Sequence, residues 1–229
     1  MHTEHKTTAD VILPESPACP LNVVLGGTPL LGRLTGIGRY TYELARALVA
    51  SQIVDDLKLW GDLSFLDAGV LKRIDPIGEG PAGLADKKNR GRSGSLAVSA
   101  RAFASRSYYA SMVYQFVSGA MAERRLRPLA DSHLYHSPNF IMPHFDGARV
   151  ITIHDLSTIR FPQFHRKQMV VLCQGGIHSA IEGKVHVITD SFHIRDELVN
   201  DFGVEISRIS TVHLAPDPRC RPRHESECR

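Results

Sequence analysis

The stretch RVITIHDLSTIRFP (149–162) holds the residues best suited to chemistry. Its β-branched run VITI predicts a buried strand of a parallel sheet, and His154 and Asp155 follow near the point where that strand ends. In open α/β sheets, ligands bind at the carboxyl edge of the strands. The imidazole and the carboxylate are therefore the first candidates for groups that contact a substrate. The alternative is a strand-end histidine that bonds a neighbouring backbone group.

A glycine-containing loop near the amino terminus is the second candidate. The apolar segment 21–25 predicts a strand, and TGIGRYTYELARALVA (35–50) predicts a helix. The loop at Gly36, Ile37 and Gly38 would present backbone N–H groups and the positive end of the helix dipole to a phosphate or another anion. It lacks the third glycine of a dinucleotide fingerprint, which disfavours NAD. The alternative is a tight turn whose glycines provide positive φ.

The rest of the chain alternates short apolar runs with helical patterns. Further strands are expected at 56–60, 133–140, 184–189 and 209–214, and further helices at 95–126, 166–181 (poorly formed near Gly175 and Gly176) and 191–203, the last capped by Asp190 or Ser191. The absence of hairpin signals predicts an α/β fold, a Rossmann-like, doubly wound and mostly parallel sheet with helices on both faces. We expect a flexible lead-in at 1–20, one domain at 21–218 and an irregular tail at 219–229.

Basic residues gather between positions 87 and 127. Nine lysines or arginines against one acid give this segment a charge of +8, in a chain whose net charge is +3. One interpretation is a basic amphipathic helix that rests on anionic lipid or on a polyanionic glycan. The other is a core-facing helix with a solvated basic side, whose apolar stripe includes Phe116 and Ala120. No RNA-binding or helix-turn-helix motif accompanies the charge, so nucleic acid is not an expected partner.

The composition is that of an ordinary globular protein. The 229 residues are 43% hydrophobic and 22% charged, which suits one larger domain. The sequence shows no apolar leader, no membrane-spanning run and no CxxC pair, so we expect a cytoplasmic protein without disulfides. Cys220, His224 and Cys228 recur at four-residue spacing, but Pro222 and the lack of a fourth ligand argue against a metal site.

Five segments, in this order, resemble the family-4 (group 1) glycosyltransferases of the GT-B fold. They are TGIGRYTYELARAL, HSPNFIMP, ITIHDLSTIRFP, VITDSFHIRDELVNDFGV and ISTVHLAPDP, and they extend over most of 21–218. In that family two Rossmann-like domains face each other, the first holding mainly the acceptor and the second binding the nucleotide sugar. The resemblance implies that this chain is the first domain, and that the donor-binding domain is absent from it.

The resemblance also implies roles for the candidate residues. The loop at Gly36, Ile37 and Gly38 would approach the diphosphate and the sugar of the donor. His154 matches the active-site histidine of the family, and Asp155 would orient that imidazole or help to deprotonate the acceptor hydroxyl. Contacts with the acceptor are expected from Arg39, Tyr40 and Asn139.

The function that the resemblance implies is sugar transfer from a nucleotide sugar to a glycan or lipid-linked acceptor, in surface polysaccharide biosynthesis. Enzymes of the family retain the anomeric configuration and need no metal or other cofactor, and this sequence has no Asp-x-Asp motif. Activity would require a donor-binding domain in cis or in trans, and the segment 87–127 is the expected contact with the inner face of a membrane. The alternative function is a non-catalytic module that binds a saccharide or a partner protein.

Overall fold

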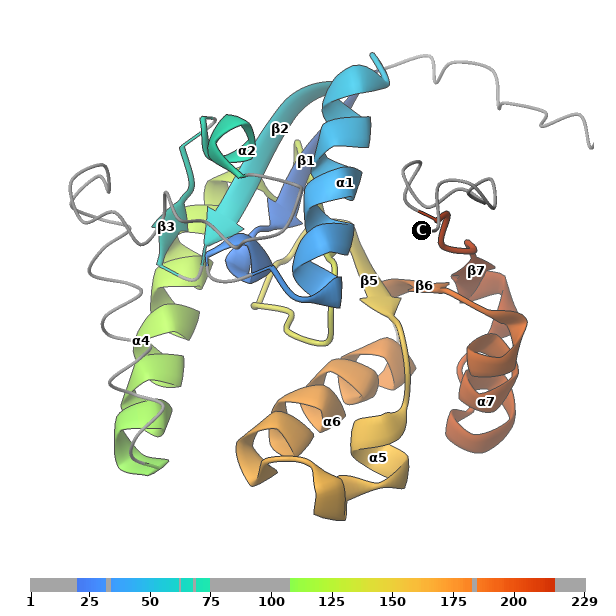
Figure 1. The fold of residues 1–229 in the computed structure, drawn as a ribbon. Helices are drawn as coiled ribbons and strands as arrows, with labels where there is room; N and C mark the ends of the chain where they lie inside the picture. The colour runs from blue at the N-terminus through green and yellow to red at the C-terminus, as the bar shows by residue number, and fades with distance from the viewer. Residues whose placement is uncertain are drawn as a thin grey trace, which may run out of the picture.

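A seven-stranded sheet forms the centre of the computed structural model, which describes residues 20–31, 34–61, 63–67, 69–74, 108–182 and 185–216. The strand order is β3-β2-β1-β4-β5-β6-β7. All neighbouring strands are parallel except the pair β2 and β3. The predicted Rossmann-like, mostly parallel α/β sheet is thus confirmed (Figure 1).

The elements follow the predicted order, with short additions. The strands are β1 (Leu21–Gly26), β2 (Val54–Gly61), β3 (Ser64–Phe65), β4 (Leu134–Ser137), β5 (Arg149–Ile153), β6 (Val185–Thr189) and β7 (Ile209–Thr211). The α-helices are α1 (Gly36–Ala50), α2 (Val70–Arg73), α4 (Tyr108–Leu126), α5 (Ser157–Arg160), α6 (Lys167–Glu182) and α7 (Phe192–Phe202). Single 3-10 turns are η1 (Thr28–Leu30), η2 (Arg127–Leu129), η3 (Pro162–Phe164) and η4 (Ile206–Arg208).

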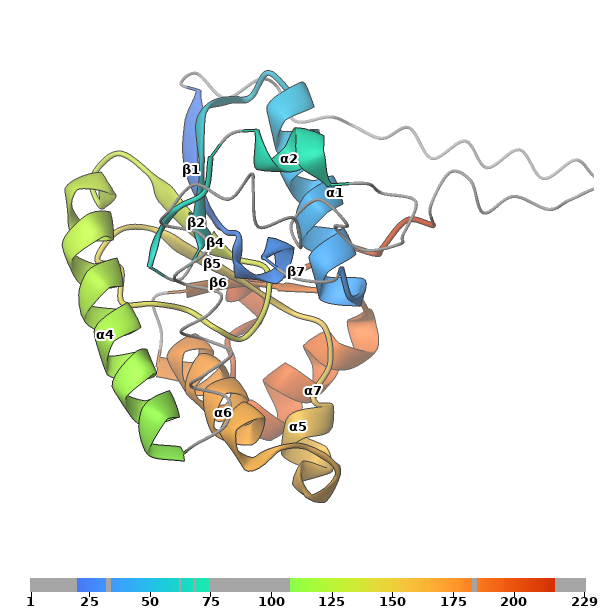
Figure 2. The same ribbon diagram turned by 60° about the vertical axis from the view of Figure 1, so that its left-hand side comes forward.

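Helices cover both faces of the sheet. Adjacent residues of a strand point to opposite faces; Leu25 belongs to the core cluster that contains residues of α1, whereas Val24 belongs to the cluster that contains residues of α4. Ile151 lies on the same face as Val24 by strand register, and its cluster contains residues of α6 and α7. Helix α1 therefore lies on one face, and α4, α6 and α7 lie on the other (Figure 2).

The order of strands reverses between β1 and β4. From β1 the chain moves to β2 on one side, and from β4 it moves through β5, β6 and β7 on the other. Such a switch point leaves a crevice beyond the carboxyl ends of the two strands, where open α/β sheets bind their ligands. A ligand site is therefore expected beyond the carboxyl ends of β1 and β4 and of the neighbouring strands β2 and β5.

Helix α4 differs from its predicted packing. Its described part is helical as expected, but Phe116 is 79% exposed and Ala120 is also exposed. Ala122 and Leu126 are the buried residues, and they pack with Val24. The predicted stripe was wrong at Phe116 and Ala120. This segment contains many alanines and serines, so its hydrophobic pattern does not clearly distinguish the buried face of the helix from the exposed one. Several predicted segments lie outside the described residues: the lead-in up to residue 19, positions 87–107 of the basic segment, the first part of the helix predicted at 95–126, and the tail at 219–229.

The glycine pair in α6 does not interrupt the helix. Both Gly175 and Gly176 lie inside a continuous helix, contrary to the prediction of a poorly formed segment. A Cβ on Gly176 would lie 2.2 Å from the carbonyl oxygen of Phe140, whereas nothing lies within 4 Å of one on Gly175. Gly176 thus allows α6 to approach the loop that follows β4, and that approach offsets the low helix propensity of glycine.

The start and end of α7 follow the predicted signals. The Ser191 hydroxyl accepts a hydrogen bond from the Ile194 N–H at 3.3 Å, so Ser191 is the cap rather than Asp190. Gly203 ends the helix with φ of 67°, in the left-handed region that favours glycine. Capping by Ser191 leaves the Asp190 side chain available for another contact.

Candidate active site

Three neighbouring parallel strands place polar groups at the same edge of the sheet. Pro138 follows β4, His154 follows β5 and Asp190 follows β6. The His154 Nδ1 atom lies 2.6 Å from Asp190 Oδ2, and its Nε2 atom lies 3.0 Å from the carbonyl oxygen of Pro138. The side chains of His154 and Asp190 are 15% and 17% exposed. The imidazole is therefore held on both sides in a half-buried position.

Helix α1 brings a third element to this imidazole. The Tyr40 ring meets the His154 ring edge to face, with centroids 4.8 Å apart and an interplanar angle of 85°. The Tyr40 hydroxyl lies 3.2 Å from Thr152 Oγ1. Burial raises the pKa of Tyr40, so its phenol stays neutral. Because Tyr40 lies in the second turn of α1, the glycines that begin this helix and His154 lie at the same edge of the sheet.

A second histidine lies beneath the first. His136 on β4 is 7% exposed, and its Nε2 atom lies 2.9 Å from Thr152 Oγ1. Burial lowers the pKa of His136 to about 4, with a smaller contribution from the charge of His154. His136 is thus neutral near pH 7. The contacts of Tyr40, Thr152 and His136 join α1 to β4 and β5 below the reactive edge.

The amino terminus of α1 leaves room for a ligand. Gly36 and Ile37 are exposed, and nothing lies within 4 Å of a Cβ built on Gly36. Gly38 is buried, and its N–H donates to the Thr35 hydroxyl at 3.4 Å. Neither glycine has positive φ, so the expectation that these glycines provide positive φ is wrong. Arg39 is half-buried in the same turn, and its own N–H donates to the Thr35 carbonyl at 2.9 Å.

Asp155 makes different contacts from those expected. Its Oδ1 atom accepts hydrogen bonds from the Ser157 N–H at 2.8 Å and from the Ser157 hydroxyl at 2.7 Å. Asp155 therefore stabilises the turn that begins α5, and the carboxylate that contacts His154 is Asp190. The sequence contained the signal for Asp190, because a polar residue directly after a strand was the criterion that selected His154. The Asp190-Ser191 pair was interpreted only as a helix cap.

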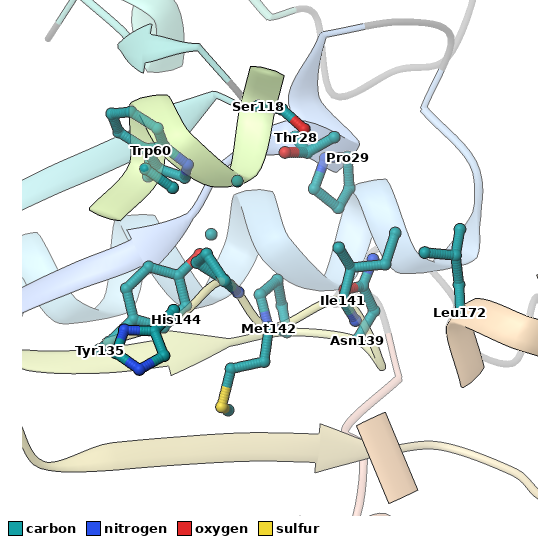
Figure 3. A pocket seen from close by; sticks show the side chains of 15 residues that line it. Thr28, Pro29, Trp60, Ser118, Tyr135, Asn139, Ile141, Met142, His144 and Leu172 are labelled. Carbon is teal, nitrogen blue, oxygen red and sulfur yellow. The ribbon is translucent and has the colours of Figure 1, made fainter. Parts of the chain in front are cut away.

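A cavity of about 300 Å³ opens at the switch point between β1 and β4. Trp60 and Tyr135 contribute aromatic walls, and Asn139 lies in the loop that follows β4 (Figure 3). Asn139 Oδ1 accepts from the Ile141 N–H at 3.0 Å, so this side chain also holds the loop in shape. Pro138 lines the cavity, and its carbonyl contacts His154. The dyad and the cavity are thus neighbours. Trp60 was not predicted as a site residue, although it is the last residue of the predicted strand 56–60.

The described residues contain neither a metal-binding cluster nor a membrane-spanning helix. Among the ranges given above, no three residues of the types His, Cys, Asp and Glu are arranged to hold a metal ion. No described helix combines the length and the apolar character needed to cross a bilayer. Cys220, His224 and Cys228 lie outside these ranges.

The fold and the edge residues together define a Rossmann-like α/β domain with a histidine–carboxylate pair beside a switch-point cavity. The chain is 28% identical over 208 residues to the O-antigen chain mannosyltransferase B of Escherichia coli. The match covers 91% of this chain and 51% of that protein, so the chain spans about half the length of this relative. No family model matches the chain, and no solved structure matches it significantly.

Proposed function

We propose that this chain is the acceptor-side half of a glycosyltransferase that moves a sugar from a nucleotide sugar to a glycan or lipid-linked acceptor in surface polysaccharide synthesis. The observation that carries the proposal is the His154–Asp190 pair at the edge where α1 also begins, beside the switch-point cavity. The similarity to an O-antigen chain mannosyltransferase supports it and makes mannose the first sugar to test.

On the donor side, the chemistry requires positive charge near the departing diphosphate. The nucleoside diphosphate gains negative charge as its bond to the sugar breaks, and fixed dipoles stabilise that charge. The exposed amino terminus of α1, at Gly36, Ile37 and Gly38, supplies N–H groups and the positive helix end. His154 contacts the transferred sugar. As in the family that the sequence resembles, the transfer retains the anomeric configuration and uses no metal and no other cofactor.

On the acceptor side, the cavity supplies what a saccharide requires. The half-buried apolar side chains of Ile141 and Met142 suit the apolar faces of sugar rings, and the polar groups of the cavity suit the hydroxyls. Asn139 and Arg39 contact the acceptor, and Tyr40 does so through its exposed edge. Asp155 remains the candidate for a group that assists the acceptor hydroxyl, because it is exposed beside His154.

A donor-binding domain completes the site, either in the same polypeptide or in trans. The E. coli relative is about twice as long as the matched region, which supports this part of the proposal. The unmatched part of that relative is the natural source of the missing half for an experiment.

The enzyme is proposed to work in the cytoplasm at an anionic membrane surface, with the segment 87–127 as the contact. Its described part supports this, because Val113, Phe116 and Val117 on α4 are exposed and Arg124 and Arg125 lie in the last turn. Sedimentation with vesicles that contain anionic lipid tests the contact. Absence of binding at low salt would contradict it.

The transfer proposal is tested by fusing this chain to the part of the E. coli protein that lies outside the match. Purified fusion is incubated with a radiolabelled nucleoside-diphosphate mannose and a lipid-linked or free saccharide acceptor. We expect labelled product from the fusion, and none from either part alone. Failure of a folded fusion to transfer sugar from any nucleotide sugar would contradict the proposal.

A non-catalytic saccharide-binding module is the second candidate. The cavity favours it, because side chains of β2, β4 and α4 line a volume of about 300 Å³ at the switch point. Saccharide binding by the chain, together with no transfer by any fusion, would select this function.

A further inference from the structure

The contact between His154 and Asp190 specifies where one hydrogen of the imidazole lies. An ionised carboxylate can only accept hydrogen bonds. The 2.6 Å separation of Nδ1 from Asp190 Oδ2 therefore places a hydrogen on Nδ1. The distance is at the short end of the range for hydrogen bonds to charged groups.

The second ring nitrogen also faces an acceptor. Nε2 lies 3.0 Å from the Pro138 carbonyl oxygen, which has no hydrogen to donate. Both contacts are satisfied together only when both nitrogens of His154 carry hydrogen.

Among the described residues, the Asp190 carboxylate has one side-chain hydrogen-bond partner, His154. The other carboxylate oxygen, Oδ1, is buried and has no hydrogen-bond partner among the described residues. A buried charge without a partner is costly, so the His154 contact is the main compensation for this carboxylate. His136, the other imidazole nearby, is neutral near pH 7 because burial lowers its pKa to about 4.

Backbone contacts fix the position of Asp190, and the Tyr40 ring limits rotation of the His154 ring. The Asp190 carbonyl accepts a hydrogen bond from His213 Nδ1 at 2.9 Å, and the next residue, Ser191, caps α7. On the other side, the Tyr40 ring lies against the imidazole at 85°. The imidazole therefore has one favoured orientation, with Nε2 directed to the loop that lines the cavity.

We propose that Asp190 is the positioning residue for His154: it holds the hydrogen on Nδ1 and thereby keeps the imidazole in the orientation in which Nε2 faces the loop that lines the cavity. In the fusion enzyme, this orientation is the one in which the ring acts on the transferred sugar. The role in transfer rests on the function proposed above, whereas the orientation of the ring does not.

The orientation is tested on the chain itself by ¹⁵N-labelled histidine and two-bond ¹H–¹⁵N spectra of the imidazole near neutral pH. Such spectra distinguish a ring nitrogen that carries hydrogen from one that does not. In the unaltered chain we expect hydrogen on Nδ1 of His154. Asp190→Asn should remove that preference, because a neutral amide can donate to Nδ1 as well as accept from it.

Asp155→Asn is the matched control, since it removes the carboxylate next to His154 in sequence that bonds Ser157 instead. It should leave the His154 signals unchanged. Thermal unfolding of both variants shows that each is folded. An unaltered Nδ1 signal in Asp190→Asn, or hydrogen found only on Nε2 in the original chain, would overturn the proposal.

The role in transfer is read from the fusion enzyme. Asp190→Asn should lower kcat by at least about tenfold and leave KM for the acceptor unchanged, as expected when a carboxylate orients a working histidine. An equal kcat would overturn the positioning role. If the fusion of the unaltered chain transfers nothing, the proposed function fails, and the spectra still decide whether Asp190 orients His154.

Discussion

At the scale of single residues, two histidines on neighbouring strands have opposite environments. His154 ends β5 at the rim and contacts a carboxylate, whereas His136 lies inside β4 and contacts the Thr152 hydroxyl. Burial lowers the pKa of His136 to about 4, so this imidazole is neutral near pH 7. The two side chains are therefore suited to different tasks. His154 can present a hydrogen-bond donor to a substrate, and His136 supports the strand beneath it.

His136 predicts a loss of stability in acid. Its pKa is about 4 in the folded chain, against 6.5 for an unperturbed histidine, so the unfolded chain binds more protons between these values. Stability should therefore fall as pH drops below about 6.5, and the fall should be complete near pH 4. The expected loss is about 3 kcal/mol. Urea unfolding at several pH values, compared with His136→Gln, isolates this contribution.

The comparison uses only the pH dependence, because the substitution also alters stability at neutral pH. Other groups titrate in both proteins and cancel in the difference. Equal losses of unfolding free energy in the two proteins on acidification from neutral pH to pH 4 would show that the pKa of His136 is not lowered in the folded state.

At the scale of elements, helix α6 packs against the loop that lines the cavity. Its close approach at Gly176 sets the position of Phe140, which follows the cavity residue Asn139. Gly175 is exposed and has no neighbour that a methyl group would meet. Packing therefore requires a glycine at position 176 but not at position 175.

Substitution by alanine should have opposite effects on stability at Gly175 and Gly176. Gly176→Ala should destabilise the chain by roughly 1–3 kcal/mol, because its Cβ would lie 2.2 Å from a backbone oxygen that cannot move aside freely. Gly175→Ala should stabilise it by roughly 0.5–1 kcal/mol through helix propensity. Chemical denaturation measures both. Similar effects of the two substitutions would mean that α6 does not approach Phe140 as described.

The elements also show how far the sequence could be interpreted. Strand and helix order was predictable because β-branched runs, glycine ends and the Ser191 cap are local signals. Whether a glycine breaks a helix or packs against a neighbour is decided by tertiary contact, so Gly175 and Gly176 were misjudged. The two-residue strand β3 pairs with β2 through a turn and is too short to have a periodicity.

The site could be predicted in part for the same reason. His154 and the loop at Gly36 follow strands, so the rule for open sheets predicted that they meet at one edge, and Tyr40 contacts His154 there. Asp190 follows a strand as well, but its distance of 36 residues from His154 gave no sequence signal for a contact. The cavity walls come from β2, β4 and α4 together, which only the assembled sheet reveals.

At the scale of the whole molecule, the cavity and the edge that carries His154 both lie next to the switch point of the sheet. The chain moves outward from β1 and β4 in opposite directions, and the cavity opens between them. His154 and Asp190 follow β5 and β6, the next two strands on the β4 side. Pro138 links them to the cavity, because it lines the cavity and its carbonyl contacts His154. A donor held by a second domain would approach from the open rim.

The cavity itself contains a spectroscopic reporter. Trp60 is the only tryptophan of the chain, and it lines the cavity. Titration with mannose-containing oligosaccharides should change its fluorescence, with a dissociation constant of about 1 mM for this isolated half. Met142→Ala, which alters another wall of the cavity, should weaken the binding. Unchanged fluorescence well above that concentration would argue against saccharide binding there.

The central claim is that His154 acts on the transferred sugar, and sugar transfer by the fusion enzyme tests it most directly. His154→Ala should lower kcat about 100-fold, the loss typical of removing one donor from a site of developing charge. His178→Ala, at an exposed histidine of α6, should leave kcat unchanged and serves as the control. Transfer by His154→Ala at the rate of the unaltered fusion would contradict the account.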